Sequence, residues 1–231
     1  MFIPITKEWD VKEQDIIDTL GRKAADHEAI AAEVLQNPGA ITVLLGGLSA
    51  KKANIKYGSE KVLRLVSERQ PELLYPHFDR FVELMDGENK FLKWGGIMIL
   101  SNLAAVDTDR RIEQIFERYF TAITGPVMVT AANIVGGAVK IARANPDLTD
   151  KIVAEILKVE KARYLMHGEP SPECNNVVCG QAVGALAEIY DQVSDRKEVR
   201  EFIDRQLHSS RPAVRKKAKQ FFATHKEAAD E

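Results

Sequence analysis

The segment Gln70-Pro71-Glu72-Leu73 follows an apolar stretch with helical spacing, and a matching segment, Asn145-Pro146-Asp147-Leu148, follows another such stretch 75 positions later. An interval of 75 holds two repeats of 37 or 38 residues, and Val106-Asp107-Thr108-Asp109 lies where the boundary between them is expected. Self-similarity at a fixed period of this size is typical of repeat proteins. The sequence therefore indicates an array of equivalent units.

The same register extends along the chain. Equivalent positions are Tyr57, Trp94, Ala132, Gly180 and Ala218, at spacings of 37, 38, 48 and 38. The one long spacing predicts about ten extra residues in the fourth unit, and the segment 166–176, which is rich in turn-forming residues, supplies them. We expect this segment to be a loop inserted between two helices.

Apolar residues within each unit recur at intervals of three and four, which predicts a pair of helices rather than strands. Large side chains such as Phe78 and Phe81 mark the first helices. Small residues mark the second helices. Glycine pairs recur at repeat-like positions inside helices, at Gly46-Gly47, Gly95-Gly96 and Gly136-Gly137. Because small side chains let helices approach closely, we expect these glycines to serve packing rather than phosphate binding.

The clearest local motif is Pro212-Ala213-Val214-Arg215-Lys216-Lys217-Ala218, and the segment 126–132 matches it in part. Proline is favoured in the first turn of a helix, where its missing N–H has no partner to lose. The motif, the period and the helix pairs resemble the HEAT-repeat family over nearly the whole chain from about residue 38, and small prokaryotic HEAT-like proteins are similar in length and layout. The resemblance implies an all-α, ARM-type fold, a right-handed αα-superhelix of about five HEAT-like helix pairs.

We expect residues 1–231 to form a single solenoid domain. The segment 1–37 lies outside the repeat register and is interpreted as an N-terminal helical cap, because the end units of a solenoid must shield an apolar face. About five repeats occupy residues 38–226. The polar tail 227–231 is expected to be frayed.

Composition excludes several classes of protein. With 45% hydrophobic residues and a net charge of −2, the chain has no globally basic surface to attract nucleic acid or anionic lipid. The N-terminus lacks a signal-peptide pattern, and no apolar run is long enough to span a bilayer. Two cysteines, Cys174 and Cys179, are too few for a disulfide framework. These features predict a cytoplasmic protein without membrane contact.

Residues that could carry chemistry are scattered. The five histidines are His27, His77, His167, His208 and His225. They form no metal-binding pair, and His27-Glu28 is the only dipeptide of the kind that HEAT-like deoxyhypusine hydroxylases use several times to hold iron. Cys174 and Cys179 are interpreted as one loop thiol and one buried thiol, with a redox-sensitive pair as the alternative. Nothing corresponds to the chromophore site of the phycobilin-lyase HEAT-like proteins, so no catalytic residue, metal or cofactor is expected.

The candidate binding residues are cations and aromatics on the second helices or in the loops before them. They are Lys52, Lys56, Tyr57, Lys90, Lys93, Trp94, Lys140, Arg143, Arg215 and Lys216. The HEAT resemblance implies that second helices line the concave face, so these side chains would form a basic groove. The alternative interpretation is an ordinary solvated face with aromatics that serve packing.

Two functions follow from this charge pattern. The first is a non-catalytic protein-binding scaffold or adaptor that binds an acidic protein partner through the concave face, with the inserted loop at its edge. The alternative is a nucleic-acid-binding protein related to the HEAT-like DNA alkylation-repair glycosylases, which are similar in length and have a basic concave face. Those relatives are more basic and bring several tryptophans together, whereas this chain has only Trp9 and Trp94.

Overall fold

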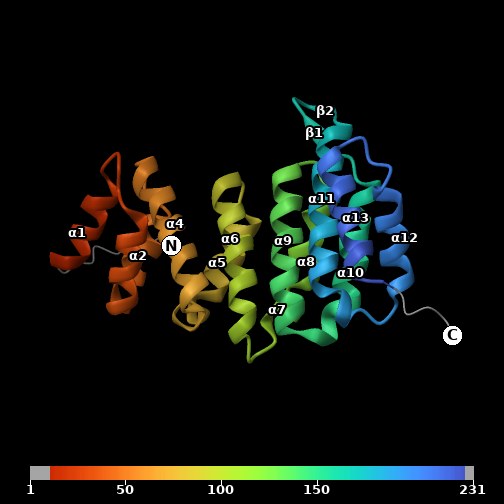
Figure 1. Ribbon diagram of the computed structural model, residues 1–231. Helices are drawn as coiled ribbons and strands as arrows, with labels where there is room; N and C mark the ends of the chain where they lie inside the picture. Colours follow the sequence, from red (N-terminus) through yellow and green to blue (C-terminus); the bar gives the residue numbers. More distant parts are fainter. Residues whose placement is uncertain (1–10, 227–231) are drawn as a thin grey trace. The chain divides into compact units, whose positions relative to one another are not determined.

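The computed structural model describes residues 11–226, with side chains from residue 15 onward. This part of the chain is all-α apart from one short hairpin of strands β1 and β2 (Figure 1). The α-helices are α1 (Val11–Leu20), α2 (His27–Gln36), α3 (Ile41–Gly47), α4 (Ala53–Arg69), α5 (Phe78–Asp86), α6 (Lys90–Leu103), α7 (Arg111–Gln114), α8 (Phe116–Phe120), α9 (Met128–Ala144), α10 (Thr149–Leu157), α11 (Pro172–Ile189), α12 (Arg196–Gln206) and α13 (Pro212–Thr224). The predicted all-α architecture is confirmed.

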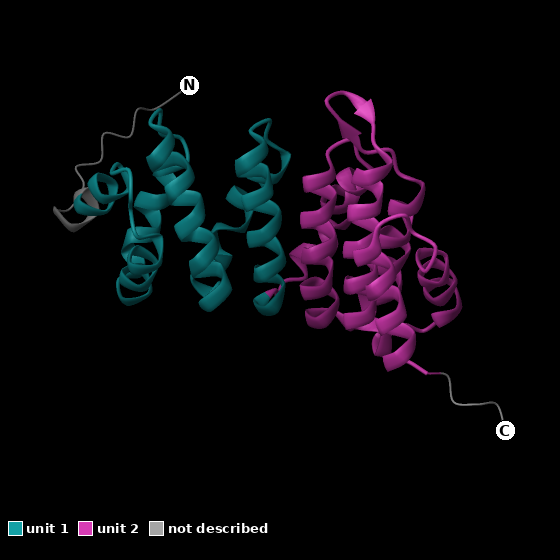
Figure 2. Ribbon diagram, turned by 45° about the horizontal axis from the view of Figure 1, so that its top comes forward, with its two compact units in different colours: residues 1–106 teal, residues 107–231 magenta. Residues whose placement is uncertain are grey.

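The chain divides into two compact units, Met1–Val106 (unit 1) and Asp107–Glu231 (unit 2) (Figure 2). In unit 1 the pairs are α3 with α4 and α5 with α6. Unit 2 contains three pairs. In the first, α7 and α8 lead into the 3₁₀ turn Thr121–Thr124, which packs on α9; in the other two, α10 packs on α11 and α12 packs on α13. The described residues therefore hold the five helix pairs that the sequence predicts.

The proline segments that revealed the repeat are short 3₁₀ turns that join a second helix to the next first helix. Gln70 and Asn145 precede the turns at Pro71–Leu73 and Pro146–Leu148, with nearly equal backbone angles of φ −141°, ψ 74° and φ −131°, ψ 76°. A residue before proline is driven out of the α region, so the second helix has to end there. Asn37, before Pro38–Ala40, has φ −135° and ψ 78° and is a further copy that the sequence analysis missed.

The second helices pack side by side within each unit. In unit 1, α4 contacts α6, while α5 covers α6 and α2 covers α4. In unit 2, α11 lies between α9 and α13. Fully buried aromatic side chains fill the space between first and second helices, with Phe78 and Phe81 in unit 1 and Tyr119 and Phe202 in unit 2. The large residues of the first helices thus form the core, as their spacing predicts.

The inserted segment 166–176 is more ordered than the expected loop. Strands β1 (Leu165–Met166) and β2 (Glu169–Pro170) form an antiparallel hairpin, and residues from Pro172 onward already belong to α11. The buried hydroxyl of Tyr164 donates to the carbonyl oxygen of Ile123 at 2.6 Å, and the Leu165 amide donates to Pro126 at 2.9 Å. These bonds fix the base of the hairpin against the segment that precedes α9.

The N-terminal helices α1 and α2 pack against α4 in unit 1, in the region expected to be a cap. Residues 1–10 of that expected cap, and the expected frayed tail 227–231, lie outside the described residues. No single described helix is long and apolar enough to cross a membrane. One bent pair, His27–Gln36 with Pro38–Gly47, meets the length and composition criteria together, at an angle of 120°.

Candidate binding surfaces on the second helices

Three aromatic rings meet on the second helices of unit 1. Tyr57 on α4 lies 5.4 Å from Phe91 on α6, and Phe91 lies 5.3 Å from Trp94, measured between ring centroids. Tyr57 and Trp94 are half-buried, whereas the Phe91 side chain is 60% exposed. We call Tyr57, Phe91 and Trp94 the aromatic surface. Tilted and edge-to-face contacts of this kind are the geometries that aromatic pairs prefer.

The aromatic surface is positioned by Asn89, the N-cap residue of α6. Its side-chain oxygen accepts from the amides of Phe91 at 3.1 Å and Leu92 at 3.2 Å, which is the ordinary role of asparagine at a helix start. Its amide nitrogen donates to the Tyr57 hydroxyl at 3.2 Å. One side chain thus starts α6 and ties it to α4, so the three rings are held in place.

Lysines surround these rings. Lys56 precedes Tyr57, and Lys90 and Lys93 flank Phe91 and Trp94 on α6. Within the described part of the chain, none of these three lysines forms an ion pair with a carboxylate. Unit 1 therefore presents apolar rings and uncompensated positive charge on the same helices.

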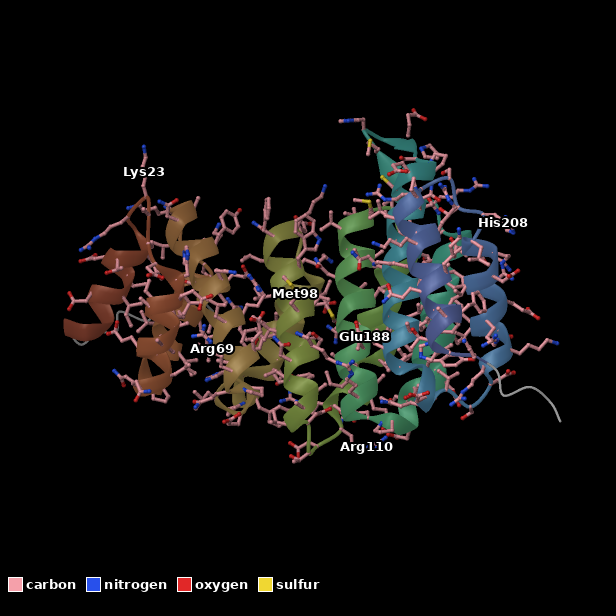
Figure 3. All side chains as sticks on the ribbon, viewed as in Figure 1. Lys23, Arg69, Met98, Arg110, Glu188 and His208 are labelled. Atoms are coloured by element: carbon pink, nitrogen blue, oxygen red, sulfur yellow. The ribbon has the colours of Figure 1, made fainter. Side chains whose placement is uncertain are left out.

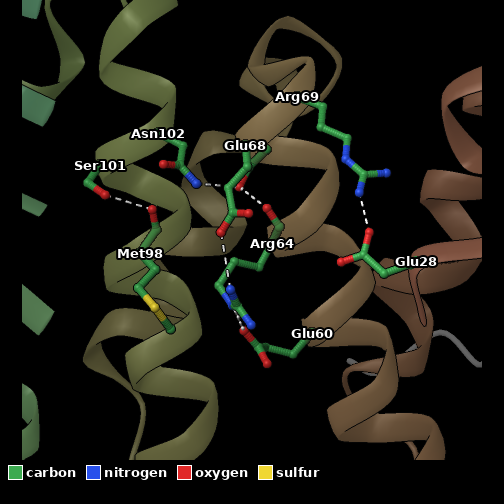
Figure 4. Close-up of polar contacts among 9 residues, drawn as sticks. Glu28, Glu60, Arg64, Glu68, Arg69, Met98, Ser101 and Asn102 are labelled. Atoms are coloured by element: carbon green, nitrogen blue, oxygen red, sulfur yellow. Dashed lines mark hydrogen bonds and ion pairs between the residues drawn. The ribbon is translucent and has the colours of Figure 1, made fainter. Parts of the chain in front are cut away.

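A polar network lies deeper between the helices of unit 1 (Figure 4). Arg64 on α4 pairs with Glu60 at 3.5 Å and with Glu68 at 3.1 Å. Beside them, the amide group of Asn102 on α6 donates to the buried Ser67 hydroxyl at 2.8 Å. Burial raises the pKa of Glu60, and the nearby Arg64 opposes this shift only in part. Glu60 is therefore a carboxylate whose charge costs more in the folded chain than in the unfolded one.

The Glu60 shift predicts a pH effect on stability. Because the pKa of Glu60 is higher in the folded chain than in the unfolded chain, the folded chain binds the proton more tightly. The resulting stabilisation is fully present below the unfolded pKa of 4.5, and it is lost as the pH rises through the folded pKa. We therefore expect Glu60→Gln to flatten the decline of unfolding free energy between pH 4.5 and neutrality, because glutamine does not ionise. Urea denaturation at several pH values measures this. The exposed Glu83→Gln variant is the control, and equal profiles for both variants would contradict the assignment.

In unit 2 the second helices form a hollow of about 300 Å³ between α9, α11 and α13. Two candidate residues from the sequence, Lys140 and Arg143, line it together with Lys217. Arg143 is paired with Glu188 of α11 at 2.8 Å, and the Lys217 ammonium group donates to the Gly180 carbonyl at 2.9 Å. Much of the positive charge here is therefore already engaged, in contrast to the aromatic surface.

The remaining candidate residues lie elsewhere. The Arg215 guanidinium donates to the carbonyl oxygens of Ser209 at 2.7 Å and Ser210 at 3.0 Å, so it holds the loop before α13. Lys216 is exposed and is not among the residues that line the hollow. The Lys52 ammonium group lies over Gly21, in the turn after α1, instead of beside the aromatic rings.

The position of one of the two cysteines differs from that expected from the sequence. Both Cys174 and Cys179 are buried free thiols on α11, so the interpretation of Cys174 as a loop thiol is wrong. Five positions apart on one helix, their side chains point in different directions. Burial, with a smaller effect of Glu160, raises the pKa of the Cys179 thiol to about 12.

A thiol held protonated by burial reacts slowly, because the thiolate is the nucleophile. We expect Cys179 to resist iodoacetamide in the native protein at neutral pH and to react fully once the chain is unfolded in urea. Mass spectrometry of the labelled peptides measures this for each cysteine. Alkylation of Cys179 in the native protein at the rate of a free thiol would contradict the prediction.

No group of three histidine, cysteine or acidic side chains that could hold a metal gathers among the described residues. His27 lies against Gly58 of α4, and His225 stacks on Phe221 of α13, so both ring contacts are packing contacts.

Sequence reasoning missed Phe91, and it counted Lys217 among the cations of the last helix without choosing it as a candidate binding residue. Phe91 looks like an ordinary apolar helix residue, but Asn89 two positions earlier marks the helix start and puts Phe91 in its exposed first turn. That capping signal was present in the sequence. Lys217 shares its helix with Arg215 and Lys216, and only the packing of α13 on α11 shows which of the three reaches the hollow.

Comparisons with known proteins show the fold. No protein-family model matches the chain, and no curated protein matches it in sequence. A designed armadillo repeat protein is similar in structure, with a TM-score of 0.58 and 15% identity over 94% of this chain and 95% of that chain. An engineered protein is also similar, with a TM-score of 0.49 and 15% identity over 91% and 87% of the two chains. The first similarity shows a repeat fold of the armadillo/HEAT type.

Proposed function

We propose that this helical repeat protein is a non-catalytic, protein-binding scaffold or adaptor whose unit 1 binds an acidic segment of a partner through the aromatic surface. The observation that supports this most strongly is the position of Phe91. Its ring is 60% exposed, yet it is held between Tyr57 and Trp94 on two packed helices. Ordered, exposed aromatic rings are typical anchors of protein interfaces, because their burial releases water without ordering a flexible side chain.

The lysines around the rings favour an acidic partner. Lys56, Lys90 and Lys93 have no carboxylate partner within the described residues, so a neighbouring anionic segment gains attraction without breaking an ion pair. A partner segment with one large apolar side chain beside acidic residues fits both features. The apolar side chain would contact Phe91, and the acidic residues would lie near the lysines.

Nucleic acid is the competing partner, because single strands also use aromatic rings and cations. The arginines favour protein instead, since guanidinium groups are the usual bidentate ligands of phosphate. Eight of them are already paired with described carboxylates, mostly at the surface: Arg64, Arg69, Arg80, Arg110, Arg143, Arg196, Arg205 and Arg211. A phosphate backbone would have to compete with these carboxylates for the guanidinium groups.

Selection from a phage-displayed peptide library on the full-length protein tests the proposal. We expect enriched peptides to combine a large apolar residue with neighbouring acidic residues. Parallel binding assays with single-stranded DNA and RNA at low salt test the competing partner. The proposal would be overturned if the enriched peptides lacked acidic residues. It would also be overturned if no peptide were enriched and the protein bound nucleic acid in a salt-sensitive way.

A further inference from the structure

A hollow of about 250 Å³ lies beside α4 in unit 1. One wall is formed by Asn54, Tyr57, Gly58 and Lys61, whose spacing of three and four residues places them on one face of the helix. The first turn of α4 opens into the same space, and no side chain caps it. The hollow therefore runs along the helix that also carries the aromatic surface.

The opposite wall comes from the turn between α1 and α2. Arg22 and Lys23 lie in this turn, and His27 begins α2; the Lys23 side chain extends outward from the helices (Figure 3). The Asn54 side-chain amide donates to the Arg22 carbonyl at 3.3 Å. His27 packs so closely on Gly58 that a Cβ there would lie 3.1 Å from the ring nitrogen Nε2. These contacts hold the two walls together.

The charge of this hollow is one-sided. Its charged lining residues are Arg22, Lys23 and Lys61, all cations, and none of them forms an ion pair with a described carboxylate. Glu60, the nearest acid in sequence to Lys61, pairs with Arg64 and does not line the hollow. Lys23 extends outward, and Lys61 also interacts electrostatically with Glu60, so Arg22 and Lys61 are the cations that remain for the hollow. An anion bound in the hollow is attracted by both.

We propose that this hollow binds a phosphate-class dianion, either free phosphate or a phosphate monoester. Two cations, Arg22 and Lys61, favour a doubly charged group over a single carboxylate, and the amides at the start of α4, which no side chain caps, add partial positive charge on the same side. The volume is below the roughly 300 to 1,000 Å³ of sites that enclose drug-sized ligands, so it suits a phosphoryl group with few attached atoms. This site goes beyond the proposed function and does not depend on it.

A nuclear magnetic resonance titration of the full-length, nitrogen-15-labelled protein tests the site. Sodium phosphate replaces sodium chloride at constant ionic strength and pH, and the amides of Asn54 and Gly58 are followed. We expect saturable shifts at these two amides, and none at Gln181 in the hollow of unit 2. Phenyl phosphate distinguishes a phosphate monoester from free phosphate as the ligand. If phenyl phosphate binds more tightly than free phosphate, the ligand is a monoester whose organic part contacts Tyr57. If the two bind equally, the site recognises the phosphoryl group alone.

The double variant Arg22→Gln with Lys61→Gln should raise the dissociation constant for phosphate at least about tenfold, because two charge-assisted contacts are lost. A matched double variant, Lys151→Gln with Lys219→Gln, removes two exposed lysines of unit 2 and should titrate like the parent. Asn54→Asp, which adds a carboxylate to the wall, is a second test that keeps the cations. Three results would each overturn the proposal. The first is shifts that do not saturate, and the second is unchanged phosphate affinity in both the first double variant and Asn54→Asp. The third is benzoate binding as tight as phosphate binding.

Discussion

Replacing Gly96 with alanine is expected to lower the free energy of unfolding by about 2 kcal/mol, because it overpacks the contact between α5 and α6. A Cβ at this position would lie 2.7 Å from the Met85 amide nitrogen and 2.8 Å from the Phe81 carbonyl oxygen. Both atoms belong to the backbone of α5, so no side-chain rotation relieves the clash and the two helices have to separate. Urea denaturation followed by circular dichroism measures the loss.

Gly136 provides the matched control. It also lies within a second helix, α9, but a Cβ there would meet no atom within 4 Å. Gly136→Ala should therefore stabilise the protein by up to about 1 kcal/mol, since alanine favours the helix and nothing opposes it. The opposite signs of these two changes separate close helix packing from helix propensity. Stabilisation by Gly96→Ala would contradict the packing explanation.

Replacing Phe91 with alanine is expected to weaken binding of the selected acidic peptides by roughly 10- to 100-fold. Full burial of a phenylalanine side chain contributes about 1.5–3 kcal/mol, and most of the Phe91 ring remains available for that burial in the unbound protein. Because the ring is exposed, its removal should change the unfolding free energy much less than it changes the affinity. Isothermal titration calorimetry and urea denaturation of the same variant measure the two effects.

Two further variants identify the surface that is responsible. Val129→Ala removes another exposed apolar side chain, 38% exposed on α9 of unit 2, and should bind the peptides like the parent. Lys56→Glu combined with Lys93→Glu should weaken acidic peptides and leave a neutral peptide with the same apolar residue nearly unaffected. Equal affinity of the Phe91→Ala variant and the parent would exclude the aromatic surface as the peptide site.

Much of the fold follows from the sequence alone. Proline after Gln70 and Asn145 fixes where helices end, because it restricts the residue before it whatever the surroundings. Spacings of three and four residues place Phe78 and Phe81 in the core. Both effects act within one or two helical turns, so the helix pairs could be predicted without knowledge of the neighbouring helices.

Tertiary structure decided which of the candidate residues are available to bind. Arg143 and Lys93 are both cations on second helices, but a glutamate from α11 pairs with Arg143, whereas no described carboxylate reaches Lys93. Arg22 and Lys61 lie 39 positions apart, and the packing of the turn after α1 on α4 brings them to one hollow. Local patterns in the sequence determine helices, because helix formation depends on near neighbours. Charge balance at a surface depends on side chains from other helices, so only the packed structure determines it.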